Sequence, residues 1–368
     1  MTDPKALVRP HLFRLNPYVP GKAIRQERNI LKLASNENLL GPPASVVKAI
    51  SEAASNVHYY SDDGAVAVRN KLSEKFNLPP DWFLPTAGCA EAIFYISQAF
   101  LDPGDEIVMA QPGFPIFHIA ATVQNAVIRA VPVKDDFAAD TEKMAAAVND
   151  KTKVVWLDNP NNPCSTIVRR QQVEELIKAI NGRALFVHDE AYFDFVTDSG
   201  YCSGLEYLSA HENVVVLRTF SKIFGLAGLR IGVVIAHPDI IQALHKVRMP
   251  FNVNALAQAA LLAAVNDTEY LKLSVSLTVQ MRTKMSELLE EYGFEHVPSH
   301  TNFLLFDARV DSVELANLMN EHGVFVRPMK GAGLTTWVRA SVPANVVDCY
   351  RFADTLLACQ TKLKGNGG

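Results

Sequence analysis

The segment TFSKIFGLAGLRIG, residues 219–232, contains one lysine, Lys222, surrounded by apolar residues. A second apolar run, VVVLRTF (214–220), precedes the lysine, and Arg230 follows it near the end of the segment. Burying a cationic amine is costly unless the amine is paired, neutralised or used in chemistry. We therefore expect Lys222 to have a chemical role inside a large folded core.

The composition is that of a globular enzyme. The chain has 368 residues, of which 49% are hydrophobic and 20% charged. Its 35 basic and 39 acidic residues give a net charge of −4, and the two signs are mixed along the chain. This length predicts a large core and two subdomains. Because no basic block is present, we do not expect nucleic acid as a partner.

Cysteine usage and the N-terminus indicate a cytoplasmic protein. The five cysteines are scattered and form no CxxC pair or metal-ligand spacing, so we expect reduced thiols and no metal site. The start of the chain, MTDPKALVRP, lacks the apolar segment of a signal peptide. The most apolar window, ALAQAALLAAV (255–265), is too short to cross a bilayer. We therefore expect no membrane association.

Short β-rich runs alternate with helical patterns from about residue 43 to residue 250. Strands rich in Val, Ile and Leu, with helical crossovers between them, indicate a mostly parallel sheet with helices on both faces. The helical patterns include 141–148 and 170–180. The strand candidates are EIVMA (106–110), AVIRAVPV (126–133), KVVWLDN (153–159), ALFVHDE (184–190), VVVLRTF (214–220) and IGVVIA (231–236).

The pattern changes on either side of this region. We assign residues 1–42 to an N-terminal arm that packs on the small domain and on a partner subunit. Residues 43–255 form the large α/β domain, and residues 256–368 form a smaller α+β domain. The evidence for the smaller domain is a long helical region (254–292), NFLLF (302–306), a helix at 311–322, VFVRP (324–328), WVRASV (337–342) and a last helix at 344–360.

Polar residues follow three neighbouring strand candidates. These are NPNNP (159–163), DEAY (189–192) and the pair Ser221-Lys222. In open α/β sheets, ligands bind beyond the carboxyl ends of the strands, so these residues should meet at one edge. Taken singly, NPNNP could be an ordinary turn, Asp189 a helix cap and Tyr192 a core aromatic. In combination they indicate a cofactor site.

The combination resembles the fold-type-I pyridoxal-phosphate (PLP) enzymes, and within them the histidinol-phosphate aminotransferase-like group of class II aminotransferases. The resemblance implies an α/β fold with a large PLP-binding domain and a small C-terminal domain. It covers nearly the whole chain. The matching segments are NPYVPGK (16–22), SNENLLGP (35–42), HYYSDDGA (58–65), TAGCAEAI (86–93), NPNNP, DEAY, TFSKIFGLAGLRIG, HTNFLLF (300–306), GVFVRP (323–328) and WVRASV (337–342).

The resemblance implies roles around the cofactor ring. Lys222 would form the Schiff base with PLP and then act as the general base of the proton shift. Asp189 would pair with the pyridinium nitrogen, which keeps the ring electron-withdrawing. Asn162 and Tyr192 would donate to the phenolate oxygen of the ring. Phe114, in QPGFPIF (111–117), would stack on the ring.

The resemblance places the cofactor phosphate at TAGCAEAI, where small residues lead into a helix. The first N–H groups and the positive dipole end of a helix suit an anion. Members of this group commonly carry an acidic residue where Ala90 stands. The residues expected around the phosphate are Gly88, Cys89, Ala90, Thr219, Ser221, Arg230 and, from the other subunit, Tyr60. The contribution of Tyr60 implies a homodimer with shared active sites.

Substrate recognition is also inferred from the resemblance. Arg339 would bind the α-carboxylate of an amino acid, or the phosphate of histidinol phosphate. Arg327 is a second candidate for an anion contact, and Tyr18 and Asn38 lie in segments that close over the substrate. Three departures from the group's pattern lie near the substrate side, and they leave the substrate open. These are Cys164-Ser165 in place of Thr-Gly, Leu39 in place of Pro and Pro343 in place of Gly.

We therefore predict a PLP-dependent aminotransferase. It would move an amino group between an amino acid or amine (histidinol phosphate, or an aromatic or basic amino acid) and a 2-oxo acid such as 2-oxoglutarate. The same residues would also serve a decarboxylase, or an elimination or cyclisation enzyme. A ligand-sensing regulator would need a helix-turn-helix segment before residue 31, and a nicotinamide enzyme would need GxGxxG after its first strand. Neither pattern is present.

Overall fold

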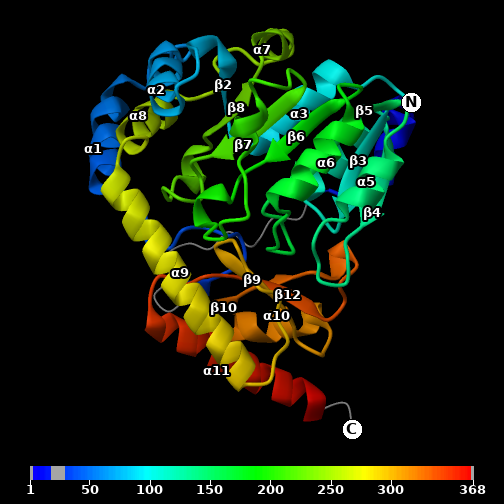
Figure 1. Ribbon diagram of the computed structural model, residues 1–368. Coiled ribbons are helices and arrows are strands. Elements are labelled where there is room, and N and C mark those ends of the chain that lie inside the picture. The colour runs from blue at the N-terminus through cyan, green and yellow to red at the C-terminus, as the bar shows by residue number, and fades with distance from the viewer. Residues whose placement is uncertain (1–2, 18–29, 366–368) are drawn as a thin grey trace.

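A seven-stranded sheet forms the centre of the larger of two packed units in the computed structural model, which describes residues 3–17 and 30–365 (Figure 1). The strand order is β2-β8-β7-β6-β5-β3-β4. The strands from β7 to β4 are mutually parallel, whereas β8 is antiparallel to both β7 and β2. The strands are β2 (Phe83–Thr86), β3 (Glu106–Gln111), β4 (Val127–Pro132), β5 (Thr152–Asp158), β6 (Leu185–Asp189), β7 (Val214–Thr219) and β8 (Gly232–Ala236).

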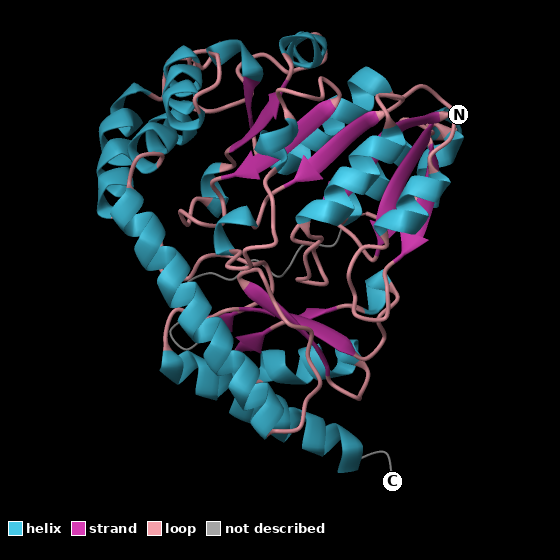
Figure 2. Ribbon diagram, viewed as in Figure 1, coloured by secondary structure: helices cyan, strands magenta, loops and turns pink. Residues whose placement is uncertain are grey.

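Helices cover both faces of this sheet, which explains why its central strands are apolar at almost every position (Figure 2). Successive residues of β5 enter opposite cores: Val154 and Trp156 face one, and Val155 and Leu157 face the other. One face carries α3 (Cys89–Phe100), α4 (Pro115–Val123) and α7 (Pro238–His245). The other carries α1 (Ala44–Ala53), α2 (Val66–Phe76), α5 (Thr141–Ala147), α6 (Arg170–Ile180) and α8 (Ala255–Ala264). The predicted α/β fold with a mostly parallel sheet is confirmed.

The smaller unit is an antiparallel sheet covered by helices. Its strand order is β11-β12-β9, and it shares a core with α10, α11 and the C-terminal half of α9. Near the N-terminus, β1 (Leu31–Lys32) pairs with β10 (Val324–Phe325), so this part of the arm belongs to the smaller unit. The elements are α9 (Thr268–Glu291), β9 (Phe303–Asp307), α10 (Ser312–Glu321), β11 (Arg327–Pro328), β12 (Trp337–Ser341) and α11 (Val346–Gly365).

The long helical region after residue 254 is two helices with different partners. Its break lies before Asp267, whose carboxylate caps α9 by accepting from the Tyr270 N–H at 3.0 Å. Ala257 and Leu261 of α8 lie in the core of the larger unit, which therefore extends to Val265. From there α9 runs along one side of the molecule into the smaller unit (Figure 1). The expected domain boundary at residue 255 stays a prediction.

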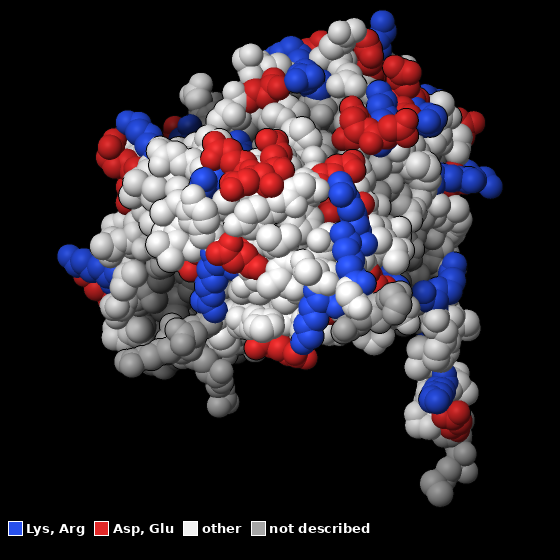
Figure 3. All heavy atoms as spheres, turned by 90° about the horizontal axis from the view of Figure 1, so that it is seen from below, with Lys and Arg blue, Asp and Glu red and all other residues white. Residues whose placement is uncertain are grey.

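Basic and acidic side chains are interspersed on the face seen in Figure 3. No helix within residues 3–17 and 30–365 is long and apolar enough to cross a membrane. In the same described part of the chain, no three His, Cys, Asp or Glu side chains are grouped closely enough to hold a metal ion.

Candidate active site

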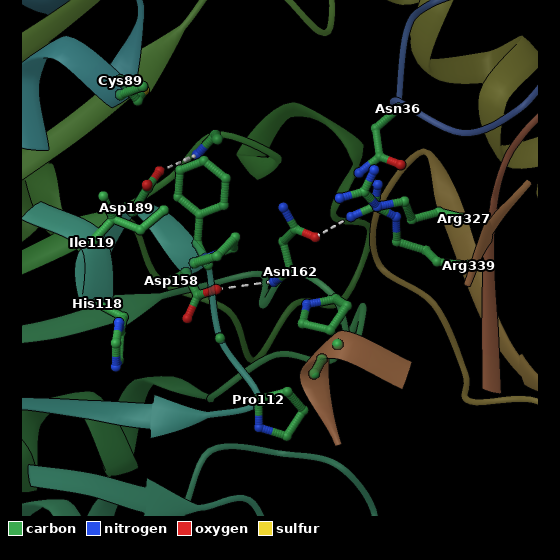
Figure 4. A pocket seen from close by; sticks show the side chains of 18 of the residues that line it. Asn36, Cys89, Pro112, His118, Ile119, Asp158, Asn162, Asp189, Arg327 and Arg339 are labelled. Atoms are coloured by element: carbon green, nitrogen blue, oxygen red, sulfur yellow. Dashed lines mark hydrogen bonds between the residues drawn. The ribbon is translucent and has the colours of Figure 1, made fainter. Parts of the chain in front are cut away.

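A cavity of about 740 Å³ lies between the two units, beyond the carboxyl ends of β5, β6 and β7. Figure 4 shows how side chains from both units turn into it. Most of the residues predicted from the sequence line this one cavity. They are Gly88, Cys89, Ala90, Phe114, Asn162, Asp189, Tyr192, Thr219, Ser221, Lys222, Arg230, Arg327 and Arg339.

Lys222 follows the end of β7 and points into the cavity. Its Nζ donates to the backbone oxygen of Ser35 at 3.3 Å. Burial, and then the positive charge of Arg339, lower the pKa of Lys222 to about 8. A much larger share of this amine is therefore neutral near physiological pH than is usual for lysine, and a neutral amine can act as a nucleophile or a base.

Asp189 ends β6 and is 3% exposed. Its carboxylate accepts a hydrogen bond from the Ala191 N–H at 3.0 Å, and burial raises its pKa to about 7. A cationic group bound next to this carboxylate would favour its charged form. Tyr192 lies on the same turn, and its hydroxyl accepts from Asn36 Nδ2 at 2.9 Å.

The start of α3 forms an anion cradle at one end of the cavity. Gly88 precedes the helix with φ +87°, and a Cβ at this position would lie 2.7 Å from Arg230 Nη2. The Arg230 guanidinium reaches Ala87 O at 3.4 Å, so it lies over the helix start. The Ser221 Oγ is buried and has no hydrogen-bond partner among the described residues. Backbone N–H groups, an arginine and an orphaned hydroxyl together suit a phosphate.

Two arginines lie on the side of the cavity that the smaller unit provides. Arg327 on β11 and Arg339 on β12 face each other in register, and both turn into the cavity (Figure 4). Arg339 donates to Asn162 Oδ1 and, at 3.1 Å, to Ala34 O. The Asn162 amide therefore lies between the ring-binding side of the cavity and the arginines.

These residues fit the cofactor that the sequence predicts. Lys222 can bind an aldehyde, Asp189 can pair with a protonated ring nitrogen, and the Gly88–Arg230–Ser221 cradle can hold a phosphate. The Ser221 hydroxyl, which is buried without a hydrogen-bond partner among the described residues, supports an anionic ligand most directly, because buried hydroxyls normally have a partner.

Two of the predicted residues within the described part of the chain, Asn38 and Tyr60, are not among the residues that line the cavity. Asn38 donates to Ile223 O at 2.9 Å and to Ser274 Oγ at 2.8 Å, so it fastens the arm to the protein interior. A substrate contact by Asn38 stays a prediction, and Asn36 lies in the cavity wall. Tyr60 is 84% exposed and stacks on Phe251, with 4.5 Å between ring centroids. Tyr18 lies outside the described residues.

Asn36 and Asp158 are two polar residues of the cavity wall that were not predicted from the sequence. Asn36 is buried, and its Oδ1 has no hydrogen-bond partner among the described residues. Asp158, the last residue of β5, is also buried. Asn36 lies inside SNENLLGP, and Asp158 directly precedes NPNNP. Their polar character inside or next to apolar runs was the available signal.

Comparison with known proteins gives the class to which this site belongs. The family model for aminotransferase class I and II matches residues 28–349. A histidinol-phosphate aminotransferase 2 from Carboxydothermus hydrogenoformans is 38% identical over 357 residues, covering 95% of this chain and 98% of the relative. A histidinol-phosphate aminotransferase from Moorella thermoacetica is 37% identical and covers 93% of this chain and 89% of the relative.

Solved structures of aminotransferases have the same fold. The crystal structure of histidinol-phosphate aminotransferase from Sinorhizobium meliloti in complex with pyridoxal-5'-phosphate superimposes with a TM-score of 0.87 at 28% identity, covering 98% of both chains. The structure of a protein from Erwinia carotovora atroseptica, described as a possible histidinol-phosphate aminotransferase, gives a TM-score of 0.86 at 27% identity and covers 91% of this chain and 97% of that one.

The fold and the site thus define a fold-type-I, PLP-dependent aminotransferase. The chain belongs to the class I and II aminotransferase family.

Replacing Gly88 by alanine tests the anion cradle. The new Cβ would displace the Arg230 guanidinium, and loss of a charge-assisted contact should weaken PLP binding roughly 10- to 100-fold. The dissociation constant is measured by titrating the cofactor-free protein with PLP. Gly104→Ala is the matched control, because Gly104 has φ +94° but no heavy atom within 4 Å of the added Cβ. Equal affinities in the two variants would contradict the assignment of the cradle.

Proposed function

We propose that the protein is an aminotransferase whose amino donor carries a phosphate group in place of an α-carboxylate, with histidinol phosphate as the leading candidate, and whose amino acceptor is a 2-oxo acid such as 2-oxoglutarate. The observation that carries the proposal is the charge arrangement of the cavity. An anion cradle near Lys222 and Asp189 suits the cofactor phosphate, and Arg327 and Arg339 remain on the opposite side for the substrate. The named relatives support the same donor.

The cavity residues then divide the work of the proposed reaction. PLP, when bound, supplies an aldehyde and an electron-withdrawing ring. Asp189 would pair with the protonated ring nitrogen, and Lys222 Nζ would act as the general base that takes a proton from the substrate Cα. The lowered pKa of Lys222 suits a base that works near neutral pH. Tyr192 and Asn162 would be the polar partners of the ring's phenolate oxygen, and Phe114 would pack on the ring.

Arg327 and Arg339 bind the anionic end of the donor, and they also accept the carboxylate of the 2-oxo acid in the second half-reaction. Bidentate contacts from guanidinium groups give both affinity and orientation to carboxylates and phosphates. Their placement on adjacent strands of the smaller unit lets one pair of cations serve both substrates in turn.

A decarboxylase or an eliminating or cyclising enzyme would use the same lysine, carboxylate and arginines. The family match and the named relatives favour amino-group transfer over these reactions. Detection of glutamate from 2-oxoglutarate separates the two possibilities, because the alternative reactions do not form it.

We also infer that the protein is a homodimer that works in the cytoplasm. Tyr60 and Tyr59 are 84% and 69% exposed, and the nearby Met249 is 65% exposed, so this surface suits a second copy of the chain. Tyr60 would reach the phosphate cradle of the partner subunit. The five cysteines are free and buried, as expected for a reducing compartment.

A substrate comparison tests the proposed donor. Histidinol phosphate, phenylalanine and arginine are each mixed with 2-oxoglutarate, and the glutamate formed is assayed. We expect the highest kcat/KM for histidinol phosphate, and Arg327→Gln should raise KM for this donor roughly tenfold with a smaller effect on phenylalanine. Arg309→Gln, an exposed arginine of the same unit, is the control. A higher kcat/KM for phenylalanine or arginine than for histidinol phosphate would overturn the assignment.

Mixed dimers test the shared active site. Lys222→Ala and Tyr60→Ala should each lose most activity, whereas an equimolar mixture, unfolded and refolded together, should recover about a quarter of the wild-type value, because half of the dimers have one intact site. Activity that stays at the level of the separate variants would show that Tyr60 does not serve the partner's site.

A further inference from the structure

Asp158 is a buried carboxylate of the cavity wall that has none of the proposed roles toward cofactor or substrate. It ends β5, is 5% exposed and lies in register with Asp189 on β6. Among the described residues, no Lys, Arg or His forms an ion pair with it. Burial and the neighbouring Asp189 charge raise its pKa to about 8. A carboxylate in this setting is costly, so its hydrogen bonds must offset the cost.

The hydrogen bonds of Asp158 go to the turn that follows β5. Its Oδ1 accepts from Asn161 Nδ2 at 3.0 Å, and its Oδ2 accepts from the Asn162 N–H at 3.0 Å (Figure 4). The second bond fixes the backbone of the residue whose side chain accepts from Arg339 in the cavity. Asp158 therefore determines where the Asn162 amide lies.

The same carboxylate also reaches a segment from another part of the chain. The link runs through Asn161, whose Nδ2 donates to Asp158 Oδ1 at 3.0 Å and also approaches Pro112 O at 3.4 Å. Pro112 belongs to the loop that ends at Phe114, directly before α4. Through Asn161, the Asp158 carboxylate thus joins the loop that carries Phe114 to the turn that carries Asn162.

These two segments carry different parts of the proposed ring site. Phe114 provides a flat surface for the ring, and Asn162 provides a polar group at its edge. They come from successive crossovers of the sheet, so their separation depends on contacts between the loops. A ring bound between them would have one orientation only if that separation is fixed to a fraction of an ångström.

We propose that Asp158 is a positioning residue whose carboxylate holds Phe114 and Asn162 at fixed places next to Asp189, so that the bound cofactor ring takes one orientation. The proposal rests on the roles proposed above for Phe114 and Asn162. It assigns Asp158 no contact with substrate and no proton transfer.

Asp158→Asn tests this proposal. The amide keeps the size of the side chain, but its NH2 group would face one of the two donors, Asn161 Nδ2 or the Asn162 N–H, and could not accept from it. We expect the PLP dissociation constant to rise about tenfold or more. We also expect a weaker or inverted circular dichroism band of the bound cofactor, which reports on ring orientation. Asp140→Asn is the matched control: Asp140 is also 5% exposed and accepts from a backbone N–H, at 3.1 Å, but lies outside the cavity wall.

The outcomes are distinct. A lower melting temperature of the cofactor-free Asp158→Asn protein, with the affinity and dichroism of the wild type, would assign the residue to stability alone and overturn the proposal. If this variant is insoluble, Asp158→Ser, which retains one oxygen acceptor, is compared in its place.

A double-mutant comparison tests whether Asp158 acts through Asn162. In an Asn162→Ala background, Asp158→Asn should raise the PLP dissociation constant by a smaller factor than in the wild type. The same factor in both backgrounds would contradict action through Asn162. A wild-type protein without a dichroic cofactor band would instead contradict the proposed ring site.

Discussion

The structure depends on the burial of one amine. Lys222 lies in a cavity where burial and the positive charges of Arg339 and Arg230 disfavour an ammonium ion. The cost is offset only if the amine is neutral or covalently bound. The sheet places Asp189 in the same cavity, where burial, and then the negative charge of Glu190, disfavour its carboxylate. A ligand that reacts with an amine and carries a cationic ring nitrogen satisfies both groups at once.

The two units supply different parts of the site. The larger unit supplies rigid strand ends and a helix start, which hold the cofactor-binding groups in place. The smaller unit brings Arg327 and Arg339 on short strands, and α9 and the N-terminal arm join it to the larger unit.

Local patterns were sufficient for most of the fold and for the centre of the site. The central strands of the parallel sheet are apolar at most positions, and the polar residues at their carboxyl ends indicated where Asp189 and Lys222 meet. The edge strand β2, only four residues with Pro85 among them, carried too weak a pattern to be predicted.

Two residues of the cavity wall, Asn36 and Asp158, could not be predicted from local sequence. Asn36 has φ +55°, and this turn directs its side chain to the cavity while Asn38 turns to Ile223 and Ser274. Sequence spacing does not show which of two nearby asparagines faces a ligand. Asp158 is the last residue of a predicted strand, and the segments that it helps to connect, those of Phe114 and Asn162, meet only in the folded chain.

The most direct measurement locates the covalent attachment of the cofactor. The protein is incubated with PLP, reduced with borohydride, digested, and its peptides are sequenced by mass spectrometry. The account predicts a pyridoxyl group on Lys222 and its loss, without replacement elsewhere, in Lys222→Ala. A pyridoxyl group on a different lysine, with Lys222 unmodified, would contradict it.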